Sequence, residues 1–135
     1  MKTILVVEDD DLMKLLLTDL LRQETPYFPL VVGAGSEAIE VTSHIIPDLF
    51  LLDYRLPDMN GIELYDRLHG QNKLASVPAL FLSAHLRRSD LQRAIKHRQL
   101  EALEKPFDLE KFLLMVEQGV RSQAGDPCSR LPVRW

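Results

Sequence analysis

Charged and hydroxyl side chains stand where short apolar runs of this chain give way to polar residues. Glu8 and Asp9 follow a first run, Asp53 a second and Ser83 a third, and Lys105 lies just before a proline. If these runs are parallel strands of one open sheet, their carboxyl ends form a single crevice in which the side chains meet. Three carboxylates, a hydroxyl and an ammonium in one crevice indicate metal-assisted phosphoryl transfer.

The carboxylates carry the strongest part of that interpretation. One carboxylate at a strand end is usually a helix cap or a solvated loop charge, but Glu8, Asp9 and Asp53 would crowd together if their strands are neighbours. Like charges at such range raise each other's pKa unless a cation lies between them. A hard divalent ion such as Mg²⁺, which takes oxygen ligands, meets that need. Asp10 and Asp11 have the simpler role of capping the next helix.

A carboxylate beside Mg²⁺ can act as a nucleophile toward phosphorus, because the ion screens the charge of the incoming oxygens. Lys105 would then pair with the phosphoryl group as a point charge. The hydroxyl of Ser83 would donate a hydrogen bond to another phosphoryl oxygen. Taken singly, Ser83 is an ordinary turn residue and Lys105 an ordinary surface charge. Together with the acids they predict a phosphoryl-binding site.

Apolar runs and helical periodicities alternate along the chain and predict a strand followed by a helix, five times over. Strands are predicted at 3–7, 30–32, 48–52, 78–82 and 100–103. Their apolar runs are continuous, which is typical of parallel strands covered on both faces. Helices are predicted from Asp10 or Asp11 up to Thr25, from 36 to about 46, from 62 to 68, from a cap at Ser89 or Asp90 to 95, and from a cap at Asp108 to 120. Short strand–helix–strand connections indicate an α/β fold with right-handed crossovers.

The composition is that of a single folded domain in a reducing compartment. The net charge of −4 argues against nucleic acid as a partner, and the only cysteine, Cys128, cannot form an intrachain bridge. The apolar run at the N-terminus is too short for a signal peptide, and no stretch approaches the roughly 20 apolar residues of a membrane span. We therefore expect a cytoplasmic protein that does not bind membranes, with one domain over residues 1–122 and a tail or linker at 123–135.

Four stretches of the chain resemble the receiver domain of two-component response regulators, the CheY-like superfamily. They are residues 4–10, 48–61, 81–84 and 105–107, and they lie at the intervals usual for that family. The resemblance covers residues 1–122 and implies a flavodoxin-like (βα)5 fold, a doubly wound parallel sheet with strand order 2-1-3-4-5. It also implies a receiver in phosphorelay signal transduction, which catalyses its own phosphoryl acceptance and loss but turns over no external substrate.

The same resemblance implies how the acids act. Asp53 would be the phosphoacceptor and would take a phosphoryl group from the histidine of a histidine kinase or of a histidine phosphotransfer protein. Asp9, Asp53 and the backbone carbonyl of Arg55 would bind Mg²⁺, and Glu8 would assist through a water molecule.

Other roles implied by the resemblance concern the phosphoryl group and the switch. Ser83 would follow the phosphoryl group in the switch, and Lys105 would bind it. Arg55 and His85 lie where the family tunes the rate at which the acyl phosphate is hydrolysed. The Lys105–Pro106 bond would be cis, an isomer that is rare outside proline.

The chain departs from the family pattern in two ways in the region of the switch. Ala102 stands where family members usually carry Tyr or Phe, three residues before the lysine, and Arg98-Gln99 replaces a usual Gly-Ala pair. The active-site set is complete, but the aromatic half of the switch is missing. We therefore expect activation to be relayed by the backbone and the fourth helix, or to be weak. An alternative is a pseudo-receiver, an interaction module that does not depend on phosphorylation.

The fourth predicted helix and its flanks carry many basic side chains. Within this segment only Asp90 offsets the basic set, which consists of Arg87, Arg88, Arg93, Lys96 and Arg98. A solvated helix face is one explanation of this pattern. The other is a docking surface through which Arg87, Arg88 and Arg93 contact an acidic downstream protein.

A glycine-rich segment offers a competing interpretation of the whole chain. Residues 33–38 read Gly-Ala-Gly-Ser-Glu-Ala and match the dinucleotide-binding fingerprint, after a strand and before a helix. This is the second strand–helix unit rather than the first, however, and the nearby carboxylates would repel a pyrophosphate. We therefore expect no nucleotide binding at this segment.

Overall fold

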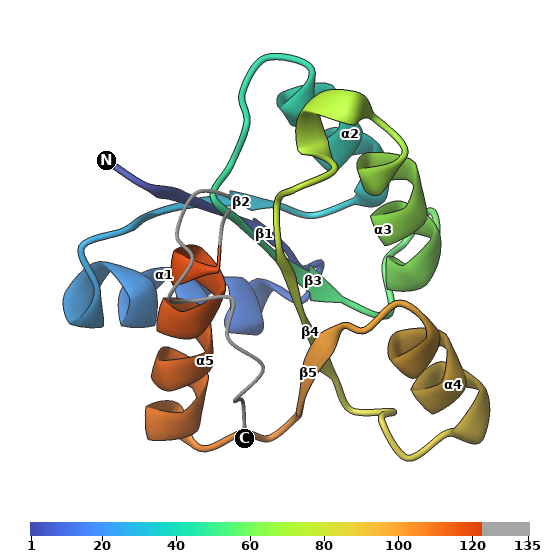
Figure 1. Ribbon diagram of the computed structural model, residues 1–135. Helices are drawn as coiled ribbons and strands as arrows, with labels where there is room; N and C mark the ends of the chain where they lie inside the picture. The colour runs from blue at the N-terminus through green and yellow to red at the C-terminus, as the bar shows by residue number, and fades with distance from the viewer. Residues whose placement is uncertain (123–135) are drawn as a thin grey trace.

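A parallel sheet of five strands lies at the centre of the fold, in the order β2-β1-β3-β4-β5 (Figure 1). The computed structural model describes residues 1–122, so the tail expected at 123–135 lies outside the described residues. The strands are β1 (Thr3–Val7), β2 (Phe28–Val32), β3 (Leu49–Asp53), β4 (Ala79–Ser83) and β5 (Glu101–Glu104). This order and the parallel pairing of all neighbours confirm the flavodoxin-like α/β fold.

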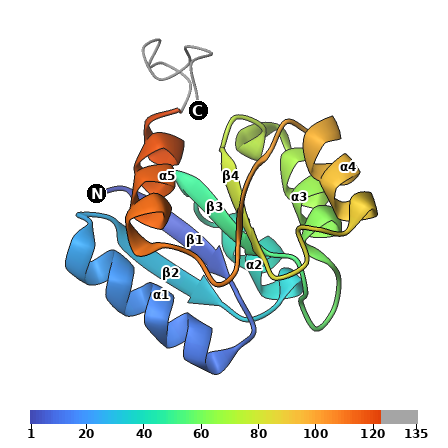
Figure 2. The same ribbon diagram turned by 90° about the horizontal axis from the view of Figure 1, so that it is seen from below.

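Helices cover both faces of the sheet. They are α1 (Asp11–Glu24), α2 (Gly35–Thr42), α3 (Gly61–His69), α4 (Ser89–His97) and α5 (Leu109–Arg121), with a short 3-10 helix, η1 (Asn72–Leu74), after α3. Helices α1 and α5 lie on one face, and α2, α3 and α4 lie on the other (Figure 2). None of the helices within residues 1–122 is both long enough and apolar enough to cross a membrane.

The composition of the strands explains why both faces are covered. In β3, Leu49 and Leu51 belong to the core on the side of α1 and α5, whereas Phe50 and Leu52 belong to the core on the side of α2 and α3. Each of these side chains is at most 1% exposed. Because successive side chains of a strand point to opposite faces, such a strand needs a helical layer on each side.

The strand register brings the functional candidates to one edge of the sheet. Val7 pairs with Leu52, next to Asp53, and Asp53 pairs with Leu82, next to Ser83. The residues that follow β1 and β5 therefore meet the last residues of β3 and β4 at the carboxyl edge. Open parallel sheets bind their ligands at this edge.

Helix α2 is shorter than the sequence predicts. The expected end lies near residue 46, but α2 ends at Thr42. The Thr42 hydroxyl donates to the Ala38 carbonyl at 2.8 Å, and Ser43 N–H donates to the Glu40 carbonyl, three residues back, at 3.1 Å. This tighter last turn ends the helix well before Pro47, whose ring disfavours a helical conformation in the residue before it.

Strand β2 is longer than predicted, because it begins at Phe28 and includes Pro29. A proline removes one donor from a sheet, so it is tolerated where no neighbouring strand needs that donor. Strand β2 is an edge strand that pairs only with β1, which satisfies this condition.

Helix α4 lacks the side-chain cap that Ser89 or Asp90 was expected to provide. Its N-cap residue is Arg88, which makes no capping hydrogen bond. The Asp90 carboxylate instead accepts from the Arg88 guanidinium at 2.8 Å and from the Leu91 N–H at 2.9 Å. Leu91 is also the one buried residue of this helix. Helix α4 therefore has fewer buried residues than any other α-helix of residues 1–122.

Helix α1 carries more leucines than the core accommodates. Leu17 and Leu21 are buried, whereas Leu12, Leu15 and Leu16 are 76, 62 and 46% exposed. The helical spacing of these residues correctly predicts the helix but does not show which of its leucines face the sheet.

Candidate metal and phosphoryl site

Three carboxylates gather at the carboxyl edge of the sheet, as the sequence predicts. One oxygen from each of Glu8, Asp9 and Asp53 lies within 4.8 Å of the other two. Glu8 and Asp9 directly follow β1, and Asp53 ends the neighbouring strand β3. Glu8 is buried, Asp53 is half-buried and Asp9 is exposed, so the cluster opens to solvent on the side of Asp9.

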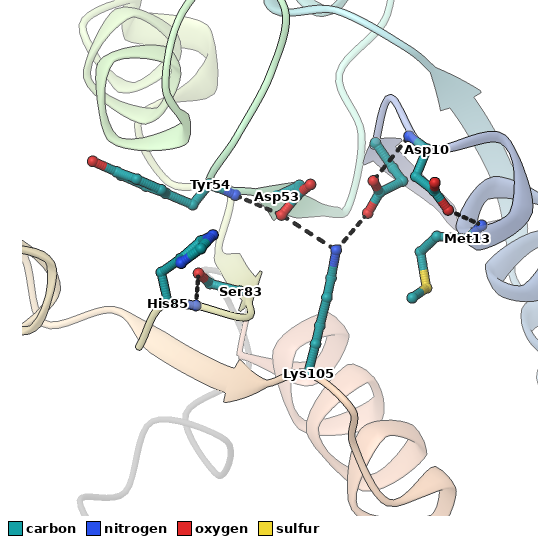
Figure 3. A network of polar contacts seen from close by, with 8 residues as sticks. Asp10, Met13, Asp53, Tyr54, Ser83, His85 and Lys105 are labelled. Atoms are coloured by element: carbon teal, nitrogen blue, oxygen red, sulfur yellow. Dashed lines mark hydrogen bonds and ion pairs between the residues drawn. The ribbon is translucent and has the colours of Figure 1, made fainter. Parts of the chain in front are cut away.

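Lys105 reaches this cluster from the segment directly after β5 (Figure 3). Its ammonium lies 2.9 Å from Glu8 Oε1 and 3.3 Å from Asp53 Oδ1. The backbone N–H of Lys105 donates to the Ser83 carbonyl at 2.9 Å, which continues the pairing of β4 and β5. The Lys105–Pro106 bond is cis, as expected. The lysine therefore bridges two acids that come from different strands.

Burial and neighbouring charges set the protonation of these groups. Burial raises the pKa of Asp53 to about 6, the negative charge of Glu8 adds to this effect, and Lys105 opposes it. Burial also lowers the pKa of Lys105, but its hydrogen bond to Glu8 and the charges of both acids outweigh burial and hold that pKa above its usual range. Lys105 is therefore firmly protonated, whereas Asp53 ionises only as the pH approaches neutrality.

Backbone N–H groups orient two of the carboxylates (Figure 3). Tyr54 N–H donates to Asp53 Oδ1 at 2.8 Å, and Asp10 N–H donates to Glu8 Oε2 at 3.1 Å. The carboxylate of Asp10 accepts from Met13 N–H at 2.8 Å and caps α1, as predicted. The Asp10 side chain therefore caps the helix, and only its backbone N–H contacts the cluster.

The donor set fits a hard divalent cation. Glu8, Asp9 and Asp53 offer only oxygen ligands, and a single ammonium offsets part of their combined charge. Oxygens bound to one Mg²⁺ lie within about 4.2 Å of each other, twice the usual bond length of roughly 2.1 Å. Small side-chain rotations are enough to close the cluster from 4.8 Å to that span. A cation would also relieve the cost of ionising Asp53, because burial and the negative charge of Glu8 raise the pKa of that carboxyl.

Ser83 and His85 lie at the same edge of the sheet. Ser83 ends β4 and is fully buried, and His85 is half-buried in the loop that follows. The Ser83 hydroxyl oxygen accepts from the His85 N–H at 2.9 Å, which leaves the hydroxyl proton for another acceptor (Figure 3). Their roles in phosphoryl binding and in the hydrolysis rate stay predictions.

Arg55 belongs to the loop between β3 and α3, which begins directly after Asp53. A β-bridge pairs Arg55 with Asn60, and Gly61 N–H donates to the Tyr54 carbonyl at 2.7 Å. A Cβ at Gly61 would lie 2.4 Å from the backbone oxygen of Asp53, so this closure requires glycine. The backbone of Arg55 is thereby held close to the acids, while its side chain is exposed.

Most basic side chains around α4 have acidic partners, so the expectation that Asp90 alone offsets them is wrong. The pairs are Arg98 with Asp66, Arg87 with Glu104 and Arg88 with Asp90, at 2.7, 3.6 and 2.8 Å respectively. Asp66 comes from α3 and Glu104 from β5, and neither lies close to its partner in sequence. Within residues 1–122, Arg93 and Lys96 are the members of this set that form no ion pair.

A groove of ≈ 850 Å³ lies between α4 and β5, where the sequence has Ala102 instead of an aromatic residue. Leu86, Ile95 and Leu100 contribute to its lining together with Ala102. Closer packing of α4 has therefore not compensated for the small side chain at position 102.

Asp58 makes a contact that the sequence analysis did not anticipate. Its carboxylate accepts from Gly35 N–H at 2.9 Å and from Ser36 N–H at 2.8 Å, at the start of α2. No local sequence signal marks such a contact, because 22 or 23 residues separate the partners. The N-terminus of α2 is therefore occupied by an internal carboxylate, which disfavours its use as a dinucleotide site.

Comparison with known proteins agrees with this geometry. The model of the response regulator receiver domain family matches residues 4–117. The luminescence regulatory protein LuxO of Vibrio campbellii is 38% identical over 92 residues, which are 67% of this chain and 20% of that protein. A putative response regulator from Chloroflexus aurantiacus has a crystal structure that superposes with a TM-score of 0.80 at 26% identity, over 88% of this chain and 97% of that one.

A second solved structure has the same fold. The receiver domain of the sensor histidine kinase PA1611 from Pseudomonas aeruginosa has a magnesium ion coordinated in its active-site cleft. It superposes with a TM-score of 0.80 at 24% identity, over 88% of this chain and 97% of that one.

The chain belongs to the response regulator receiver domain family, a family mainly of signalling modules. It spans about a fifth of the length of the LuxO proteins that it matches.

Proposed function

We propose that Asp53 accepts a phosphoryl group from the histidine of a histidine kinase or of a histidine phosphotransfer protein, with Mg²⁺ as cofactor. The observation that carries this proposal is the Lys105 ammonium, shared between Glu8 and Asp53 in a cluster of three carboxylates. An acceptor oxygen, a set of oxygen ligands and a positive charge for the phosphoryl group are then within reach of one another. Membership of the receiver family supports the same role.

The transfer is a displacement at phosphorus. One carboxylate oxygen of Asp53 forms the new O–P bond while the N–P bond to the donor's histidine breaks, and the electron pair of that bond leaves with the imidazole nitrogen. Lys105 exchanges its contact with Asp53 for contacts with the phosphoryl oxygens, where it stabilises negative charge. The Ser83 hydroxyl, whose oxygen accepts from the His85 N–H, donates its hydrogen to another of these oxygens.

The cation site is divided between direct ligands and an indirect one. Asp9, Asp53 and the backbone carbonyl of Arg55 would hold Mg²⁺, and Glu8 would assist through a water molecule. When bound, the ion neutralises charge on the phosphoryl oxygens. Engagement of Glu8 by Lys105 at 2.9 Å supports an indirect role for this acid.

The domain signals through its phosphorylation state. We infer that the receiver domain spans residues 1–122. Arg55 and His85 tune how long the acyl phosphate persists, and a downstream acidic protein reads the state through the basic surface around α4. The domain turns over no external substrate.

Acetyl phosphate, a small phosphodonor, tests the proposal on the full chain. We expect Mg²⁺-dependent addition of one phosphoryl group, seen as a mass increase of the intact protein and abolished in Asp53→Ala. Asp10→Asn is the matched control, because the Asp10 carboxylate caps α1 outside the cluster, and it should still be labelled. Labelling that persists in Asp53→Ala would place the acceptor elsewhere.

The pseudo-receiver is the second candidate. Ala102 is the observation that favours it, because a switch without its aromatic half is expected to respond less to phosphorylation. A wild-type protein that acetyl phosphate leaves unlabelled, and that captures the same partners with and without a beryllofluoride mimic, would support this candidate.

A further inference from the structure

The loop between β3 and α3 is fastened to α2 by one carboxylate. Asp58 Oδ1 accepts from Gly35 N–H at 2.9 Å, and its Oδ2 accepts from Ser36 N–H at 2.8 Å. Both carboxylate oxygens are thus used, on the first two residues of α2. The N-cap residue Ala34 makes no side-chain hydrogen bond, so Asp58 provides the cap from a different segment of the chain.

The electrostatics of a helix start favour this contact. The N–H groups there have no partner within the helix and carry positive partial charge, for which a carboxylate is a suitable acceptor. The hydrogen bond from Ser36 holds the pKa of Asp58 below its usual range. The contact therefore involves the ionised carboxylate at neutral pH.

A packing contact closes the same junction. Met59 lies so close to Gly35 that a Cβ on this glycine would be 2.6 Å from the methionine sulfur. Met59 is also packed against the core on the side of α2 and α3. Adjacent residues of the loop, one polar and one apolar, thus hold its tip on the start of α2.

The base of the same loop carries the proposed phosphoacceptor. Tyr54 N–H orients the Asp53 carboxylate at 2.8 Å, and the bridge between Arg55 and Asn60 closes the base. The base and the tip belong to one short loop, residues 54–60, so we expect a displacement of the tip to move the backbone next to Asp53.

We propose that Asp58 is a positioning residue for the metal and phosphoryl site, because its carboxylate anchors to α2 the loop that presents the backbone of Tyr54 and Arg55 beside Asp53. This inference rests on the proposed function. It also explains the glycine-rich segment at 33–38, since a helix start of the type that binds phosphate elsewhere here binds a carboxylate of the same chain.

Two variants of the full chain separate positioning from simple stabilisation of α2. Asp58→Ala removes the contact between loop and helix. Glu37→Ala is the matched control, because Glu37 accepts from Gly33 N–H at 2.7 Å at the same helix start but within one segment. Both variants lose a carboxylate at the start of α2, and only the first loses the anchor of the loop.

Calorimetry of Mg²⁺ binding provides the first readout. We expect Asp58→Ala to weaken binding about tenfold, at the lower end of the roughly 10–100-fold effect of residues that orient metal ligands. Asp58→Asn keeps one acceptor oxygen and should fall between wild type and Asp58→Ala, whereas Glu37→Ala should match wild type. Equal affinities of Asp58→Ala and Glu37→Ala would overturn the proposal.

Amide exchange without Mg²⁺ provides a readout that does not depend on the cation. Asp58→Ala should speed exchange of the Tyr54 N–H, which donates to Asp53, and of the Gly61 N–H, which closes the base of the loop, and Glu37→Ala should not. Unchanged exchange in Asp58→Ala would overturn the proposal. If Asp58→Ala does not fold, the same measurements on Asp58→Asn test the proposal by the same criteria.

The result also distinguishes this inference from the proposed function. A wild type that neither binds Mg²⁺ nor accepts a phosphoryl group contradicts the proposed function. A functional wild type together with an equally functional Asp58→Ala contradicts only the positioning role.

Discussion

Asp53 shares a lysine with a buried carboxylate, so its ionisation depends on both neighbours. Burial raises its pKa from 3.8 to about 6, with a further contribution from Glu8 and an opposing one from Lys105. A carboxyl whose pKa is raised by folding destabilises the fold wherever it has to ionise. The cost is complete above about pH 6 and fades as the pH falls toward 3.8, where the unfolded chain also takes up the proton.

Asp53→Asn should therefore stabilise the protein in the absence of Mg²⁺. A pKa change from 3.8 to about 6 corresponds to roughly 3 kcal/mol at 1.36 kcal/mol per unit, and solvent at this half-buried side chain reduces it to about 1–2 kcal/mol. Urea unfolding at pH 7.5 should show this gain, and the gain should disappear near pH 4. Equal stability of both proteins at pH 7.5 would contradict the raised pKa.

Lys105→Met should have the opposite effect on stability. The side chains of Lys105 and Glu8 are 16% and 2% exposed, so removing the lysine leaves a buried carboxylate without its counterion. Breaking a buried pair in this way costs about 3–5 kcal/mol, and added Mg²⁺ should recover part of the loss. Unfolding without Mg²⁺ measures the effect, and Lys111→Met, at an exposed lysine, should change stability by less than about 0.5 kcal/mol. A loss no larger than that of the control would show that Lys105 does not compensate Glu8.

Among the α-helices of residues 1–122, α4 is held by the fewest buried residues, so we expect it to shift most readily. It buries only Leu91, its start lacks a side-chain cap, and a groove separates part of it from β5. The segment from Ser83 to α4 begins at the site, because Ser83 ends β4 beside the strand of Asp53. A group bound to Asp53 can therefore reach α4 through the backbone, without an aromatic residue at position 102.

Amide exchange tests this route. A beryllofluoride mimic of the phosphoryl group should change exchange across residues 84–102 and leave α5, on the other face of the sheet, unaffected. Asp53→Asn is the control, since it lacks the carboxylate that binds the mimic and should show no change. If the wild type shows no change across 84–102 either, activation does not pass through α4.

The same elements show how far sequence patterns predict this fold. Each of the five strands was expected, because a continuous apolar run marks a parallel strand with two covered faces. The caps at Asp10 and Asp108 were also predicted, because a capping carboxylate lies three residues before the residue whose N–H donates to it. The end of α2 was not predicted, because it depends on a tightened backbone turn. The start of α4 was not predicted either, because an ion pair with Arg88 engages the carboxylate that was expected to cap it.

The candidate site divides in a similar way. Glu8, Asp9 and Asp53 could be placed together from the sequence, because parallel strands bring their carboxyl ends to one edge. The contact of Asp58 with α2 could not, since it joins loop and helix across 22 residues and leaves no periodic signal. Contacts that follow from strand order were thus predictable, and contacts made by single side chains between loops and helices were not.

At the scale of the whole molecule, charge is distributed unevenly. The chain carries a net charge of −4, yet five of its sixteen lysines and arginines lie within residues 87–98. Internal pairing reduces the positive field that this surface presents, because Asp90 compensates Arg88 at 2.8 Å. Arg93 forms no ion pair within the described residues and is exposed, so its charge is directed at solvent. An acidic partner would therefore depend more on Arg93 than on Arg88.

Charge reversal tests this ranking. The full chain, activated with beryllofluoride, can serve as bait in a lysate of its native host at low and at moderate salt. Arg93→Glu should weaken capture of an acidic partner and flatten its salt dependence, because a screened long-range attraction has been lost. Arg88→Glu combined with Asp90→Arg exchanges the partners of an ion pair and keeps its net charge, so it should weaken capture less, and Lys73→Glu, at an exposed position in η1, should have no effect. Equal capture by all these variants would mean that the basic surface is a solvated helix face, and the protein would then have to signal through another side of the sheet.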